Sequence, residues 1–158
     1  MSRLIKNLAL VADPWREAAA EGPLPDGDVI VPLARFTAER EALLAREGRL
    51  GVRLSPDDDP AALAGDLGHL DLVALAFPRF TDGRAYSQAR LLRERLGFAG
   101  ELRAVGDVLR DQLLLMARCG FDAFELRADK DPDDALGAFA DYSVAYQAPV
   151  SPAPGGRV

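Results

Sequence analysis

Short apolar runs of strand length alternate along this chain with segments that carry apolar residues at helical spacing. This alternation constrains the fold more than any other feature. The run at residues 72–77 (LVALAF) is almost continuously apolar, which is typical of a strand buried on both faces. Residues 50–54, 102–105 and 121–126 are further strand candidates. Strands that alternate with helices through short connections predict an α/β fold with a mostly parallel sheet.

The expected helices begin at capping residues and end at glycines. The expected caps are Thr37, Asp59 and Asp82, and the expected ends are Gly48, Gly97 and Gly120. A helix over residues 110–118 follows the strand at residues 102–105, and a last helix is expected from residue 131. Residues 4–12 predict a short strand or hairpin arm. Pro32 in the apolar run at residues 29–33 predicts an edge or terminating position in the sheet.

The length of 158 residues suits one domain with a real core. Five or six strand–helix steps are too few for a closed eight-stranded barrel. We therefore expect a single α/β domain over residues 1–148, built as a compact, mostly parallel sheet or a partial barrel. Residues 149–158 contain the sequence SPAPGG and are expected to form a disordered tail.

The charge and cysteine content exclude several classes of protein. A formal net charge of −6 disfavours nucleic-acid binding, which normally shows as a basic excess. Cys119 is the one cysteine, so no intrachain disulfide and no Cys-x-x-Cys pair can form. No apolar run approaches the ~20 residues of a membrane helix, and the first residues do not resemble a signal peptide. We expect a cytoplasmic protein without a membrane association.

Charged residues follow the predicted strands at the point where each strand ends. In an open parallel sheet, ligands bind outside the carboxyl ends of the strands. The candidate binding residues, for a ligand or a partner, are Arg79, Asp82, Gly83, Arg84, Ser87, Arg103, Asp107, Asp111, Gln112 and Arg127. A small anion at the start of the helix after Asp82 would be favoured by free N–H groups and by Arg84. The alternative is that Asp82 only caps that helix.

Asp107 and Asp111 stand four residues apart and could share one helical face. Paired carboxylates can hold a metal or perform acid–base chemistry. The favoured alternative is that Asp107 caps the helix and Asp111 pairs with Arg103 or Arg110. We therefore assign no metal, and the catalytic residues remain unknown.

Three longer motifs resemble one bacterial family. They are residues 77–93 (FPRFTDGRAYSQARLLR), residues 101–112 (ELRAVGDVLRDQ) and residues 119–124 (CGFDAF). The chain looks like a member of the family called domain of unknown function 934, whose members are described as oxidoreductases involved in sulfite reduction. The resemblance is dense from residue 29 to residue 126 and weaker toward both ends.

This resemblance implies a role in sulfur assimilation, with a sulfite reductase as a partner. The residues themselves carry no dithiol, no nucleotide-binding fingerprint and no metal-ligand cluster. Whether the chain is itself an enzyme is therefore left open. The favoured interpretation is an accessory protein that binds the reductase or helps to deliver electrons to it. The alternative is a small stand-alone enzyme that binds an anionic metabolite at the carboxyl ends of the strands.

We predict that the purified protein carries no cofactor. Flavin, haem and iron–sulfur clusters need nucleotide loops or sets of cysteine and histidine ligands, and this chain has one cysteine and one histidine. An absorption spectrum of freshly isolated protein should show only the aromatic band. A stoichiometric chromophore in the visible range would contradict the prediction.

Overall fold

The computed structural model describes residues 4–7, 9–79, 82–127 and 134–137. Eight strands form one sheet in the order β2-β1-β8-β7-β6-β5-β4-β3. The strands are β1 (Leu4–Lys6), β2 (Ala9–Val11), β3 (Arg16–Glu17), β4 (Val29–Pro32), β5 (Leu50–Leu54), β6 (Leu72–Phe77), β7 (Glu101–Gly106) and β8 (Ala123–Glu125). Strands β3 to β8 are parallel, whereas β1 pairs antiparallel with both β2 and β8. The expected α/β fold with a mostly parallel sheet is confirmed.

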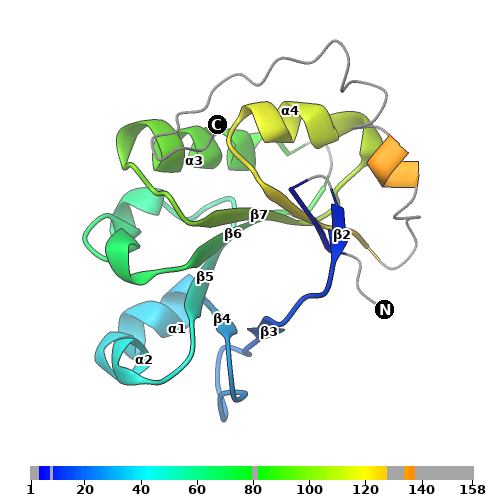
Figure 1. Ribbon diagram of the computed structural model, residues 1–158. Coiled ribbons are helices and arrows are strands. Elements are labelled where there is room, and N and C mark those ends of the chain that lie inside the picture. Colours follow the sequence, from blue (N-terminus) through cyan, green and yellow to red (C-terminus); the bar gives the residue numbers. More distant parts are fainter. Residues whose placement is uncertain (1–3, 8, 80–81, 128–133, 138–158) are drawn as a thin grey trace.

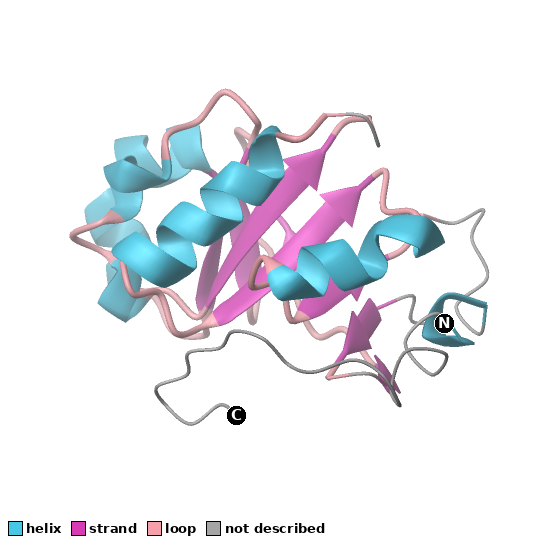
Figure 2. Cartoon of the chain, turned by 90° about the horizontal axis from the view of Figure 1, so that it is seen from above, coloured by secondary structure: helices cyan, strands magenta, loops and turns pink. Residues whose placement is uncertain are grey.

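The helices lie on the outer face of this sheet, which curves into a half-barrel (Figures 1 and 2). They are α1 (Leu33–Ala38), α2 (Arg40–Ala45), α3 (Arg84–Arg90) and α4 (Leu113–Arg118). Shorter turns are η1 (Pro60–Leu63), η2 (Leu67–His69), η3 (Leu91–Arg95) and η4 (Arg110–Gln112). Residues 134–137 are also helical. None of the helices in the described ranges is long and apolar enough to cross a membrane.

The chain passes directly from one edge of the sheet to the other, and this connection forces the curvature. Strands β2 and β3 lie at opposite ends of the strand order, yet only residues 12–15 join them. In a flat sheet the two edges would be seven strand spacings, or about 34 Å, apart. Five peptide steps reach at most about 18 Å. The sheet must therefore bend until residues 12–15, here called the strap, can cross its open side (Figure 1).

The alternation of side chains along each strand divides the core between two faces. Val73, Leu75 and Phe77 of β6 pack with the apolar sides of the helices in the main hydrophobic cluster. Leu72 and Ala74 point to the concave face, where they belong to a smaller cluster around Trp15 of the strap. A run buried on both faces is what the apolar sequence of residues 72–77 predicts.

The concave face also holds the most deeply buried charge in the described chain. Arg103 of β7 is only 1% exposed, and its neighbours on the adjacent strands are the small residues Ala74 and Ala123. Its Nη1 and Nη2 atoms donate to Asp13 of the strap at 3.0 and 3.3 Å. Its Nε atom donates to Glu101 at 3.0 Å. The bonds to Asp13 attach the strap to the middle of the sheet.

Several expected helix starts differ from the structure. Thr37 does not cap a helix, because α1 begins four residues earlier, directly after Pro32. The single helix expected up to Gly48 is divided at Glu39 into α1 and α2. Asp59 does cap its segment by accepting a bond from the N–H of Ala61 at 2.9 Å. That segment forms two 3₁₀ turns instead of an α-helix.

The two glycines at positions 65 and 68 explain the 3₁₀ turns, since glycine disfavours a continuous α-helix. Pro32 is the last residue of β4, which agrees with the expected terminating position. β1 and β2 pair antiparallel as a hairpin, which agrees with the short strand or hairpin arm expected at residues 4–12. The predicted start of the last helix at residue 131 and the predicted disordered tail at residues 149–158 lie outside the described residues.

We predict that Arg103→Gln destabilises the protein by about 3–5 kcal/mol, because it removes the buried charge partner of Glu101 and releases Asp13 of the strap. Arg53→Gln is the matched control on the same face. Arg53 pairs with Glu17 at 3.5 Å, and both side chains are more than 40% exposed. Breaking an exposed pair costs at most about 1 kcal/mol. Urea unfolding of both variants measures the difference, and equal losses would contradict the proposed role of Arg103.

Candidate functional site

The carboxyl ends of β5, β6, β7 and β8 are neighbours in the sheet, so the loops that follow them share one edge. Asp57 follows β5, and Arg79, Asp82 and Arg84 follow β6. Asp107 follows β7, and Arg127 follows β8. The structure thus places most of the sequence-predicted binding residues at the edge where they were expected. We call the group Asp57, Arg79, Asp82, Arg84, Asp107 and Arg127 the carboxyl-edge cluster.

Arg84 lies at the start of α3 between two carboxylates. Its Nε and Nη2 atoms donate to Asp82 at 3.1 and 2.7 Å, and its Nη1 atom donates to Asp57 at 2.5 Å. Asp82 also accepts the backbone N–H of Arg84 at 3.1 Å. Asp82 therefore holds the first residue of the helix, in partial agreement with the expected cap, although the position before α3 is Gly83.

Two residues that the sequence analysis did not single out hold Asp57 beside Arg84. Gln88 on the buried side of α3 donates from Nε2 to the carbonyls of Ser55 and Asp58, at 2.9 and 2.8 Å. The Asp58 side chain accepts the N–H of Ser55 at 2.8 Å. These bonds fix the loop after β5. The helical spacing of Gln88 with Ala85 and Ala89 was a usable signal, since all three are buried.

The second ion pair of the cluster joins the ends of β7 and β8. The Nη1 atom of Arg127 lies 2.6 Å from Oδ1 of Asp107. The backbone N–H of Asp107 donates to the carbonyl of Phe77 at 2.7 Å. Gly106 makes this approach possible, because its φ is +97° and a Cβ there would lie 2.4 Å from the same carbonyl oxygen. Arg84 pairs with Asp57 and Asp82 and not with Asp107.

The remaining predicted residues have simpler positions. Arg79, Gly83, Ser87 and Asp111 are exposed, and Gln112 is half-buried in η4. Arg103 does not belong to this edge, because it lies inside the half-barrel. The expected pair of Asp111 with Arg103 is wrong, since Arg103 is taken up by Asp13 and Glu101. The alternative pair with Arg110 involves a side chain outside the described part of the structure.

The ion pair of Asp82 with Arg84 favours the charged forms of both side chains. Hydrogen bonds from the side chain and the backbone N–H of Arg84 lower the pKa of Asp82 to about 2. The same pairing raises the pKa of Arg84 further above its ordinary value. Asp82 and Arg84 therefore stay charged as a pair at neutral pH. Within the described ranges, no group of three or more histidine, cysteine or acidic side chains could hold a metal ion.

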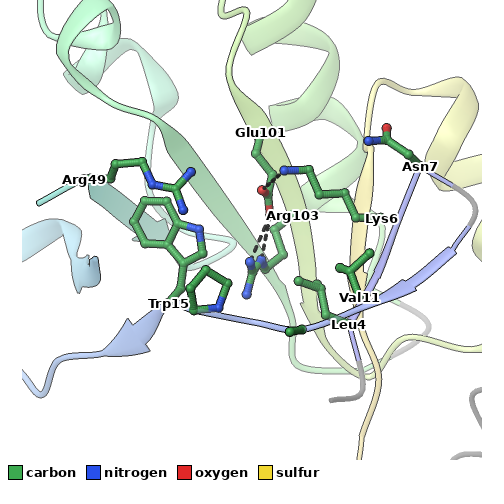
Figure 3. Close-up of a pocket in the computed structure, with 10 residues that line it drawn as sticks. Leu4, Lys6, Asn7, Val11, Trp15, Arg49, Glu101 and Arg103 are labelled. Carbon is green, nitrogen blue, oxygen red and sulfur yellow. Dashed lines mark hydrogen bonds and ion pairs between the residues drawn. The ribbon is translucent and has the colours of Figure 1, made fainter. Parts of the chain in front are cut away.

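A cavity lies at the other end of the sheet, near the amino ends of the strands. Its volume is about 320 Å³, and it opens on the concave face beside the strap (Figure 3). The polar part of its wall comes from Lys6, Asn7, Trp15, Arg49, Glu101 and Arg103. Arg103 was predicted from its motif, but Lys6, Trp15 and Arg49 carry no local sequence signal.

We predict that Arg84→Gln raises the pKa of Asp82 partway from about 2 toward its usual value of 3.8. The backbone bond remains, so the return is incomplete. A depressed carboxyl pKa stabilises the fold above pH ~4, and this contribution is lost as the pH falls through about 2. Carboxyl ¹³C NMR titration measures the pKa, with Arg95→Gln as control. A wild-type Asp82 that titrates near 3.8 would contradict the described pairing.

Comparison with known proteins supplies the family. Residues 51–154 match the family described as "Bacterial protein of unknown function (DUF934)". No curated protein matched the sequence. The matched segment covers well over half of the chain and includes β5 from its second residue, β6 to β8, the loops of the carboxyl-edge cluster and Arg103. The chain therefore belongs to the bacterial family of unknown function DUF934.

Proposed function

We propose that this protein is an accessory factor of assimilatory sulfite reduction. It assists a sulfite reductase by binding it or by helping to deliver electrons. The carboxyl-edge cluster is the proposed docking surface for the reductase. The sulfur-assimilation part of the proposal follows from the family resemblance, and the docking part follows from the geometry of the cluster.

The observation that supports docking is the exposure of ordered charges. The side chain of Arg84 is 56% exposed although it binds two carboxylates, and that of Asp57 is 84% exposed. Gln88 and Asp58 fix the loop that carries Asp57. Charges held in fixed positions on a surface provide specificity and steer the approach of a partner with complementary charges.

The same observation disfavours a stand-alone enzyme that holds an anionic metabolite at this edge. An anion would have to compete with Asp82 for the bidentate face of Arg84, and with Asp107 for Arg127. The single cysteine offers no dithiol, and it is only 4% exposed. In this proposal the redox group therefore belongs to the partner and not to this chain.

We expect Arg84→Lys to impair the function without unfolding the protein. An ammonium group is a point charge and cannot reproduce the fork of donors that joins Asp82 and Asp57. A strain that lacks the gene should grow on sulfide but not on sulfite, and the wild-type gene should restore growth on sulfite. Arg84→Lys should restore it poorly, and the tagged variant should retain less sulfite reductase in a pull-down.

Arg95→Lys is the matched control, because Arg95 is an exposed arginine of η3 away from the cluster. It should behave like the wild type, and thermal melts should show that both variants are folded. Normal growth of the deletion strain on sulfite would overturn the proposed function. Full rescue and reductase retention by Arg84→Lys would remove the carboxyl-edge cluster as the docking surface.

A further inference from the structure

We propose that the cavity beside the strap binds a small organic anion, such as a short-chain carboxylate or sulfonate. This site is separate from the carboxyl-edge cluster, and its role does not depend on the reductase. Its wall contains three cationic side chains, Lys6, Arg49 and Arg103, and one carboxylate, Glu101. Asp13 and Asp28, outside the wall, pair with Arg103 and Arg49, so the preference for a ligand with acceptor oxygens comes from the N–H groups that face the cavity and not from an excess of positive charge.

The wall also carries N–H groups without a partner among the described residues, and the Asn7 amide in the same wall adds one donor group and one acceptor. Lys6 uses its ammonium group on Glu101 at 2.9 Å, and its side chain remains 35% exposed. Arg49 donates to Asp28 from Nε and Nη2 at 3.0 and 2.9 Å, and its Nη1 has no partner among the described residues. The indole N–H of Trp15 likewise has none there, and Figure 3 shows it turned toward Arg103.

The carboxylate of Glu101 does not compete with such a ligand. Its Oε1 atom binds Lys6 at 2.9 Å, and its Oε2 atom accepts the Nε bond of Arg103 at 3.0 Å. Arg103 in turn is occupied by Glu101 and Asp13. Lys6, Glu101, Arg103 and Asp13 thus form a chain of paired charges, and the N–H groups of Arg49 and Trp15 line the cavity beside it.

An apolar wall accounts for the organic part of the ligand. Leu4 and Val11 of the hairpin line the cavity opposite Arg49 and the indole ring (Figure 3), and Pro14 of the strap also belongs to its wall. A volume of about 320 Å³ lies at the lower end of the range for small-molecule sites. Apolar walls with a few convergent donors are typical of sites that orient a small ligand.

The walls are fixed before any ligand arrives. The strap is attached to Arg103 through Asp13, whose carboxylate also accepts the N–H of Trp15 at 3.1 Å. The guanidinium of Arg49 lies 4.8 Å from the centre of the Trp15 ring, in cation–π contact. A ligand therefore meets donors whose positions are already restricted.

The chain contains one tryptophan, and it lines this cavity. Emission from Trp15 in the full-length protein therefore reports on the site directly. The probes are butyrate and 1-propanesulfonate, with butyramide as a neutral analogue and sulfate as an inorganic anion. We expect a saturable change in emission with both organic anions. Such small ligands should bind with a Kd on the order of 1 mM.

Lys6→Gln and Arg49→Gln should each weaken butyrate binding about tenfold or more, whereas Arg95→Gln on the helical side should not. Thermal melts show whether each variant is folded. If Lys6→Gln does not fold, Lys6→Arg keeps the charge and should retain binding, while Arg49→Gln still tests the removal of a donor. Isothermal calorimetry confirms the wild-type affinity independently of Trp15.

Three results would overturn the proposal. The first is no saturable response to either organic anion up to ~50 mM. The second is an equal response to butyramide or to sulfate, because the site would then not recognise an organic anion. The third is unchanged binding in folded Lys6→Gln and Arg49→Gln variants.

Discussion

The connection of four residues between the two edges of the sheet is the constraint on which this structure depends. It bends the sheet into a half-barrel and gives it a concave inner face that a flat α/β sheet does not have. The strap stays in place because Asp13 binds Arg103, which is buried in the middle of β7. Burial of that guanidinium lowers the pKa of Arg103, but Asp13 and Glu101 outweigh this effect and raise it.

The curvature separates two chemically different regions. At the carboxyl ends of the strands, the ion pairs lie on an exposed surface, where each pair contributes little stability. In the proposed function, a partner protein recognises these charges. Near the amino ends, the strap and the hairpin enclose donors next to apolar side chains. A docking surface and a ligand site could thus coexist on one chain without sharing a residue.

The fold could be predicted to a large extent, because its signals are local. The apolar run at residues 72–77 and the cap at Asp59 depend on neighbouring residues only. The inner face could not be predicted, because Asp13 and Arg103 are 90 residues apart and meet only when the sheet is curved. The helix start predicted at Thr37 was wrong, because α1 already begins at Leu33 and Thr37 lies inside it. The strand order was enough to place the charged residues at the carboxyl edge, but it could not predict which of them form ion pairs with each other.

The arginines of this family's motifs have different tasks, and the structure separates them. Arg93 donates to the carbonyls of Phe98, Gly100 and Gly120 at 2.8–2.9 Å, so it holds loops at the amino ends of β7 and β8. Arg103 holds the strap. A motif arginine in this fold is therefore not by itself a sign of an anion site, since Arg93 and Arg103 donate their hydrogen bonds to backbone carbonyls and carboxylates of the protein itself.

Arg84 differs from both of these residues, because its side chain is more than half exposed and its partners Asp82 and Asp57 belong to surface loops. Its ion pairs add little to the stability of the core, since exposed pairs are screened by water. A role in the fold explains Arg93 and Arg103 but leaves the position of Arg84 unexplained. A partner that binds the carboxyl-edge cluster would explain the position of Arg84. Among the motif arginines, Arg84 is therefore the one on which the proposed docking function most directly depends.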